Sequence, residues 1–85
     1  LLNLHMPGML MDIEKEITER LYASGIRPLI GGLIPEKAAA DLLGYSAPYM
    51  RQQAAKGLSP LPFVRRGNRR FYRIADIVIF VMNSA

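Results

Sequence analysis

The sequence predicts a mainly α-helical domain with a small β-hairpin and one extra helix at its N-terminal end. Apolar residues recur at helical spacing between residues 9 and 25, and again in two shorter segments that Gly44-Tyr45-Ser46 separates. A strand-turn-strand pattern follows at 63–74. The 85 residues allow one domain, and 51% hydrophobic against 21% charged residues favours a folded chain over disorder.

The segment 9–25 is predicted to be an amphipathic helix that ends at Gly25. Two interpretations of its apolar face stay open, namely packing onto the rest of the chain and contact with a second copy or a protein partner. Residues 1–8 are expected to lie outside the fold, as a disordered native terminus or a cloning remnant. The apolar face repeats at spacings of three and four residues and consists of Leu10, Ile13, Ile17 and Leu21.

Residues 26–34 are predicted to form an extended linker, with a short strand at most, because Pro28 and Gly31-Gly32 interrupt them. A second helix is predicted to start at Pro35, whose missing N–H suits the first helical position. Gly44 supplies the left-handed exit from this helix. Its inward face is expected to consist of Ala38, Ala39, Leu42 and Leu43.

A third helix is predicted from Ser46 to Gly57. Ser46 is a good N-cap, and because Pro48 has no N–H, the Ser46 hydroxyl is expected to cap Tyr49. Two short helices joined by Gly-Tyr-Ser have the spacing of a helix-turn-helix. The side chains expected to face inward are Met50, Ala54 and Gln53.

The chain then changes to a proline-rich loop at 58–62 and to the hairpin. The hairpin is predicted as strands 63–66 and 70–74 around a turn at 67–69. A closing helix is predicted to begin at Asp76, although β propensity alone also allows a strand. The inward face of this helix is expected to consist of Ile77, Phe80 and Val81.

Positive charge is concentrated in the second part of the chain. Residues 31–85 carry eight basic and three acidic residues, a balance of +5, whereas residues 1–30 have a balance of −1. A basic cluster of this density is typical of a protein that binds a polyanion. Because neighbours on a strand point to opposite faces, about half of the cluster is expected to reach a ligand. The others are expected to be solvated or paired with Asp76 or Glu36. The cluster contains Arg65, Arg66, Arg69, Arg70 and Arg73.

Several classes of function are disfavoured. The chain has no cysteine and one histidine, His5, so no metal site and no cofactor are expected. Glu36, Asp41 and Asp76 have no spacing that pairs an acid with a base, so an enzyme is not expected. No apolar run reaches the roughly 18–20 residues of a membrane span, and a cytoplasmic protein is expected.

If the two short helices form a helix-turn-helix, the second one enters the major groove of DNA. The candidate base-reading residues are Ala47, Tyr49, Arg51 and Gln52, since arginine pairs with guanine and glutamine with adenine. Tyr49 has a second interpretation as a half-buried core residue. The candidate contacts to the DNA backbone are Ser46, Lys56, Arg65, Arg66, Asn68, Arg69 and Arg70.

The stretch 33–46, the hairpin 63–72 and the following 73–77 resemble the excisionase and MerR-like (AlpA-like) winged helix-turn-helix family. The resemblance covers residues 33–82 and implies a winged domain that binds specific double-stranded DNA. It implies a transcriptional regulator or a recombination directionality factor of a phage or mobile element. Further implications are copies side by side on DNA and an integrase or another protein as partner. The chain departs from the family at Ile34, where a Ser or Thr cap is usual, at Pro48, and in its extra first helix.

An alternative function is a protein-interaction adaptor or an antitoxin-like module. It would bind a protein partner through the N-terminal helix. A homodimer through the same helix would predict a palindromic DNA site with half-sites one helical turn apart. RNA binding is a third interpretation, which the scarcity of aromatic residues disfavours.

Overall fold

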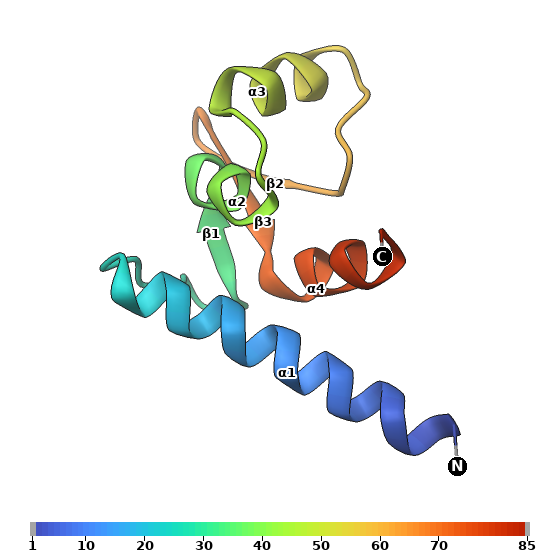
Figure 1. The fold of residues 1–85 in the computed structure, drawn as a ribbon. Coiled ribbons are helices and arrows are strands. Elements are labelled where there is room, and N and C mark those ends of the chain that lie inside the picture. Colours follow the sequence, from blue (N-terminus) through green and yellow to red (C-terminus); the bar gives the residue numbers. More distant parts are fainter. Residues whose placement is uncertain (1, 85) are drawn as a thin grey trace.

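The computed structural model describes the backbone of residues 2–84 and the side chains of residues 11–84. Four helices and a three-stranded antiparallel sheet make up these residues, with the long first helix lying along one side (Figure 1). The elements are α1 (Leu2–Ala23), β1 (Leu33–Pro35), α2 (Glu36–Leu43), α3 (Ala47–Ala55), β2 (Val64–Arg66), β3 (Arg69–Arg73) and α4 (Ile74–Asn83).

The predicted N-terminal helix is present and longer than expected. Its backbone is helical from Leu2, through Pro7 and Gly8, the two residues of low helix propensity on which the predicted start at residue 9 depended. The helix ends at Ala23, and Gly25 follows with a φ of 73°, as a C-terminal stop requires.

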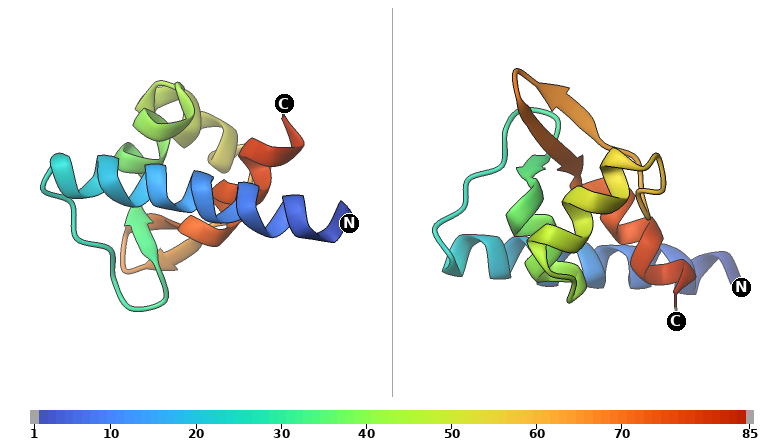
Figure 2. Two further views of the ribbon diagram at one scale, coloured as in Figure 1. Left: turned by 60° about the horizontal axis from the view of Figure 1, so that its bottom comes forward. Right: turned by 90° about the horizontal axis from the view of Figure 1, so that it is seen from above.

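The hydrophobic core joins α1 to the rest of the chain. Ile17 and Leu21 of α1 are buried in the same cluster as residues of β1, α2, α3, β3 and α4. α1 packs mainly against α4, as two further views show (Figure 2). Burial of one large aliphatic side chain stabilises a fold by about 1.5–3 kcal/mol, so α1 contributes to folding. The largest side chains at the centre of the cluster are Ile34, Met50, Tyr72 and Ile77.

α2 begins one residue later than predicted. Pro35 is extended (φ −62°, ψ 154°) and ends β1, so it is the N-cap of α2 and not its first helical residue. Gly44 leaves α2 with a φ of 81°, as predicted. The predicted burial of Ala38 and Ala39 is confirmed and extends to Ala40, whereas the predicted Leu42 and Leu43 are half-buried against the core.

The start of α3 follows the prediction in detail. The N–H of Tyr49 donates to the Ser46 Oγ (3.1 Å), and Pro48 lies in the first turn. Met50 is fully buried, whereas Gln53 and Ala54 are half-buried. Three residues, 44–46, therefore join two short helices, and both ends of the connection have a local chemical cause.

The predicted hairpin belongs to a larger sheet than expected. Its strands β2 and β3 are joined by β1, from the segment predicted as a linker, in the order β1-β3-β2. The predicted turn at 67–69 is shorter, because Arg66 pairs with Arg69 and leaves a turn of Gly67-Asn68. Gly67 has a φ of 63° while Asn68 does not have a positive φ, a combination typical of a type II′ turn.

The closing segment is a helix, so the strand alternative is wrong. α4 begins at Ile74, two residues before the predicted start, and Asp76 lies in its first turn. Ile77 is fully buried, and the predicted Phe80 and Val81 are partly buried against the core. Val78, which was not predicted, is also buried, because α4 packs against the sheet on one side and α1 on the other.

Candidate nucleic-acid interface

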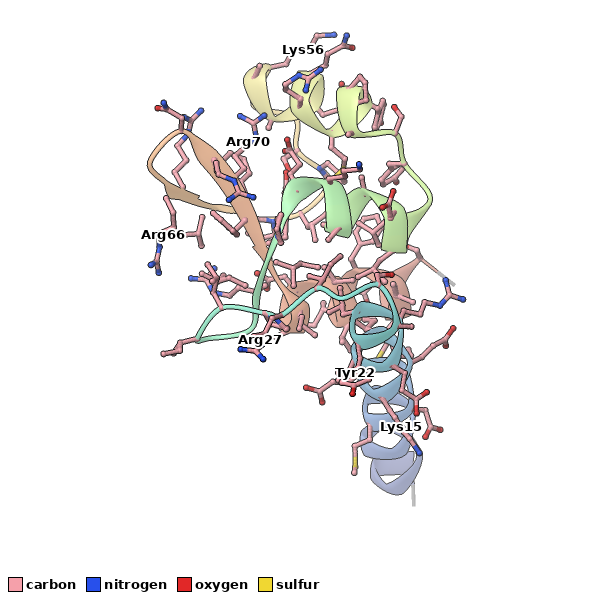
Figure 3. All side chains as sticks on the ribbon, turned by 90° about the vertical axis from the view of Figure 1, so that its left-hand side faces the viewer. Lys15, Tyr22, Arg27, Lys56, Arg66 and Arg70 are labelled. Carbon is pink, nitrogen blue, oxygen red and sulfur yellow. The ribbon has the colours of Figure 1, made fainter. Side chains whose placement is uncertain are left out.

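α3 presents a polar exterior on the side of the domain opposite to α1. Arg51 and Gln52 are exposed in the middle of α3. Met50, on the inward side of the same helix, is fully buried in the core. Lys56 caps the C-terminal end of α3, and its side chain points into solvent at the far end of the molecule from α1 (Figure 3). Ser46 is exposed and Ala47 half-buried at the other end of α3.

Tyr49 combines both of its predicted interpretations. The ring of Tyr49 lies against that of Tyr45, with 5.1 Å between the ring centroids. The Tyr45 ring in turn packs edge to face on Phe80, with 6.5 Å between the ring centroids. Yet 43% of the Tyr49 surface is exposed. One side of the residue therefore packs on the domain, and the other is available to a ligand.

Strand alternation divides the arginines of the hairpin as expected. Arg65 lies opposite Arg70 on one face, and Arg66 lies opposite Arg69 on the other. Arg65, Arg66, Asn68 and Arg69 are all exposed. The side chain of Arg66 points away from α3 (Figure 3), whereas the face with Arg65 and Arg70 is turned toward the helices.

Arg70 is not available as the DNA-backbone contact that the sequence predicts. Its Nε and Nη2 donate to the two carboxylate oxygens of Glu36 at 2.8 and 3.1 Å. The Tyr72 hydroxyl donates to the same carboxylate at 2.9 Å. The side chains of Arg70 and Glu36 are only 14% and 16% exposed. This network fixes the part of β3 next to the hairpin turn on the start of α2, and it confirms the expectation that Glu36 neutralises one arginine of the cluster.

The network changes the acid–base properties of its members. Burial raises the pKa of Glu36, but the hydrogen bonds from Arg70 and Tyr72 and the charges of Arg70 and Arg51 outweigh burial, so the pKa falls below its ordinary value. Burial and the hydrogen bond to Glu36 raise the pKa of Tyr72 to about 12. The carboxylate is thus held ionised and the phenol neutral at ordinary pH. A second ion pair joins the cluster to the other acid expected to neutralise it: the Nη1 atom of Arg73 lies 3.9 Å from the Oδ2 atom of Asp76.

A cleft of about 300 Å³ separates the start of α2, the exterior of α3 and the hairpin turn. It brings Arg51, Asn68, Arg69 and Arg70, which the sequence predicted as DNA contacts, to one place. It also contains exposed Lys37, the second residue of α2, which was not among the predicted contacts. If α2 and α3 form a helix-turn-helix, this position is a signal, since the first helix of that motif crosses the DNA backbone.

The apolar face of α1 is not an exposed oligomerisation surface. Ile17 and Leu21 are 6% and 3% exposed, and Ile13 packs against the same core. Intramolecular packing is thus the correct one of the two interpretations for these three residues, because the small domain uses them as core. The side chain of Leu10 lies outside the described residues.

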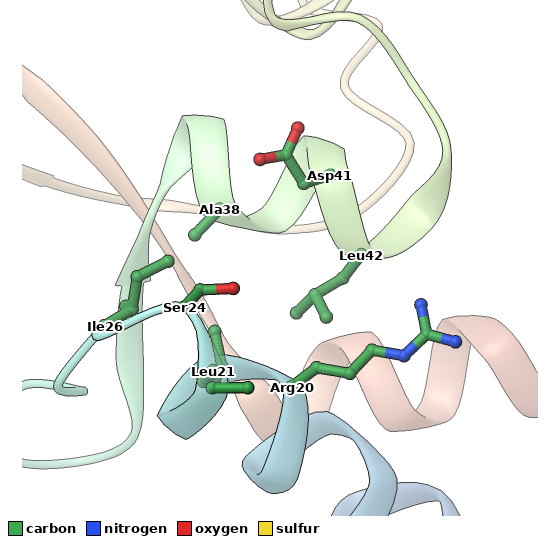
Figure 4. A pocket seen from close by; sticks show the side chains of 8 residues that line it. Arg20, Leu21, Ser24, Ile26, Ala38, Asp41 and Leu42 are labelled. Atoms are coloured by element: carbon green, nitrogen blue, oxygen red, sulfur yellow. The ribbon is translucent and has the colours of Figure 1, made fainter.

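The α1 side of the molecule has a different character. An open groove of about 300 Å³ lies between α1 and α2, with Arg20 and Asp41 as its charged residues (Figure 4). Arg20 is paired with Glu16 at 3.2 Å. Among the described residues, no group of three or more His, Asp or Glu side chains is placed to hold a metal ion. None of the described helices is both long enough and apolar enough to cross a bilayer.

Comparisons with models of protein families, with curated proteins and with solved structures find no match to this chain. The geometry is therefore the basis for assigning a function. Its main feature is that the polar exterior of α3 and the arginine-rich hairpin lie on the same side of the domain, away from α1 (Figures 1 and 3).

Proposed function

We propose that this chain is a sequence-specific double-stranded DNA-binding protein. In this proposal α2 and α3 are a helix-turn-helix, β2 and β3 are its wing, and α3 enters the major groove. The observation that carries the proposal is that exposed Arg51 of α3 lines one cleft with Asn68 and Arg69 of the basic hairpin, and that exposed Lys56 of α3 lies at the end of the molecule away from α1 (Figure 3). A folded, exposed cation cluster of this kind suits the phosphate backbone, and a neighbouring polar helix suits the base edges.

The proposed biological role is that of a transcriptional regulator or a recombination directionality factor of a phage or mobile element. It depends on the resemblance of residues 33–82 to excisionase and MerR-like domains. The order of α2, α3, hairpin and α4 agrees with that resemblance. In the recombination role, an integrase is the proposed protein partner.

Selection from a random duplex pool, followed by gel shift on the enriched and a scrambled sequence, tests DNA binding. We expect the enriched sequence to bind at least about a thousandfold more tightly, a difference usual for specific sites. Equal affinity for both duplexes at physiological salt would contradict the sequence-specific proposal.

Arg51→Ala separates base reading from backbone contact. We expect this variant to lose about 1–3 kcal/mol of discrimination at one base pair, as loss of a bidentate contact does. Arg69→Ala is the matched variant: it should weaken all duplexes and reduce the slope of log K against log salt by about 1, without changing the preferred sequence. Gel shifts at three salt concentrations measure both effects. If Arg51→Ala weakens every duplex equally, Arg51 is a backbone contact.

A further inference from the structure

We propose that the cleft between α2, α3 and the hairpin turn, the junction cleft, binds one phosphodiester of the DNA backbone. The proposal rests on the proposed function and adds a specific phosphate site to it. It makes Lys37 a DNA contact, and it leaves Arg70 to hold the wing in place. The junction cleft is lined by Pro35, Glu36, Lys37, Arg51, Asn68, Arg69 and Arg70.

The charge of the junction cleft favours an anion. Of the lining residues, Lys37, Arg51, Arg69 and Arg70 are basic, and Glu36 is the one acid. Since the Glu36 carboxylate receives two hydrogen bonds from Arg70 and one from Tyr72, its charge is already compensated by Arg70. Lys37 and Arg69 therefore remain as the exposed cations for a phosphate, while Arg51, which also lines the cleft, is the base-reading residue of the proposed function.

The same pairing shapes the junction cleft. β3 is two residues longer than its pairing with β1 requires, because Pro35 lies opposite Phe71 while β3 starts at Arg69. The hairpin turn therefore projects past the end of β1, beside the start of α2. Arg70 spans this gap to Glu36 and keeps the turn at a fixed position. Lys37 and Arg69 come from α2 and β3, and the contact of Arg70 with Glu36 fixes these two elements relative to each other.

The size and polarity of the junction cleft suit a phosphodiester. The junction cleft has a volume of about 300 Å³. This leaves room for a phosphate with some of its hydration. The Asn68 side chain adds an amide donor to the cationic groups, and phosphate oxygens accept such hydrogen bonds.

A phosphate in the junction cleft would place one DNA strand between α3 and the wing. α3 would then lie in the major groove on one side of that strand, and the hairpin would approach the neighbouring minor groove on the other. The helix and the wing would dock as a unit on this single backbone segment.

Lys37→Gln tests the proposal with Lys15→Gln as its control. Both lysines are exposed and both variants remove one charge, but Lys15 lies on α1, far from α3 (Figure 3). One phosphate contact contributes about 0.9 to the slope of log K against log salt. Because this contribution grows as the salt concentration falls below 1 M, Lys37→Gln should weaken duplex binding about five- to tenfold at 0.1 M salt. Lys15→Gln should change affinity less than twofold. The enriched duplex with single neutral methylphosphonates, placed one position at a time, should show one position at which Lys37→Gln has no further effect.

Inorganic phosphate, added to the full chain at constant ionic strength against chloride, tests the junction cleft independently of DNA. We expect the amide NMR signals of residues 36–37, 51 and 68–70 to shift saturably with phosphate. The affinity for phosphate should fall at least threefold in Lys37→Gln and stay unchanged in Lys15→Gln. If the chain binds a specific duplex but shows no phosphate response and no effect of Lys37→Gln, the proposed phosphate site is wrong and the proposed function still stands. Saturable phosphate binding in a chain that binds no duplex would overturn the proposed function, and the junction cleft would then serve a free phosphate compound.

Discussion

α1 and the hairpin are attached to the same core, but they use their charges in opposite ways. α1 inserts Ile17 and Leu21 into the core and pairs Arg20 with Glu16 on its own surface. The hairpin is fixed near its turn by Arg70 and Glu36, while Arg65, opposite Arg70, and Arg66 are exposed. The difference teaches that an apolar stripe on an amphipathic helix can be part of its own domain's core, as Ile17 and Leu21 are here. The exposed chemistry lies in the hairpin and in α3.

The largest effect that separates the two regions is expected from Leu21→Ala. The Leu21 side chain is 3% exposed in the common core, so truncation should lower the free energy of unfolding by about 2–5 kcal/mol. Tyr22→Ala is the control, because 87% of Tyr22 is exposed, and it should change stability by less than about 0.5 kcal/mol. Urea denaturation measures both variants. Equal stability losses would contradict the assignment of α1 to the core.

Glu36→Gln removes the charge that holds Arg70 and, with it, the hairpin next to its turn. We expect a loss of about 2 kcal/mol near pH 7, since hydrogen bonds to charged groups contribute about 1.5–3 kcal/mol each and the amide retains part of them. The folded pKa of Glu36 is lowered, so its contribution is present above the ordinary pKa and is lost as the pH falls through the folded pKa. Denaturation between about pH 6 and 2.5 should therefore show wild type and variant converging toward acid. A difference that is constant over this range would show that ionisation of Glu36 does not matter.

Tyr72→Phe should have a smaller effect with the opposite pH dependence. Loss of one hydroxyl hydrogen bond is expected to cost about 1 kcal/mol at pH 8. Because the folded pKa is raised to about 12, the contribution of the phenol is present below an unfolded pKa of about 10 and is lost as the pH rises through the folded value. The phenolate absorbance of wild type and variant, recorded together with denaturation at pH 8 and 11, measures both quantities. The difference between the two absorbance titrations is the titration of Tyr72. A midpoint of this difference near pH 10 would argue against the buried hydrogen bond.

The smallest effect is expected at the hairpin tip. Arg65→Gln and Arg66→Gln should each change stability by less than about 0.5 kcal/mol, because both side chains are exposed. Thermal denaturation provides the measurement, and a loss comparable to that of Glu36→Gln would place these arginines among the structural contacts.

Local chemistry was predicted from the sequence with good success. The Ser46 cap on Tyr49 followed from the missing N–H of Pro48, and the exit at Gly44 from the conformational freedom of glycine. Both features involve atoms within a few residues of each other. Helical periodicity likewise identified Ile17 and Leu21 as buried, although it did not show which surface covers them.

Long-range pairings were the features that the sequence did not predict. β1 contains three residues, one of them a proline, and becomes a strand because β3, almost forty residues later, supplies its hydrogen-bond partners. Glu36 was expected to pair with an arginine of the cluster, but not with Arg70 in particular, because a contact across 34 residues depends on how the sheet places the hairpin beside α2. Lys37 acquires its neighbours in the same way.

The order of the strands has one more consequence, which concerns self-association. β3 has partners on both sides, so β2 forms an open edge of the sheet, where another chain is able to add a strand. β2 is three residues long, and two of its residues are Arg65 and Arg66. Short length and like charges both disfavour the addition of a second β2, because the charges of two copies would repel each other at close range. Arg65 and Arg66, candidate contacts to a polyanion, thus also make the β2 edge of the sheet a poor site for strand addition.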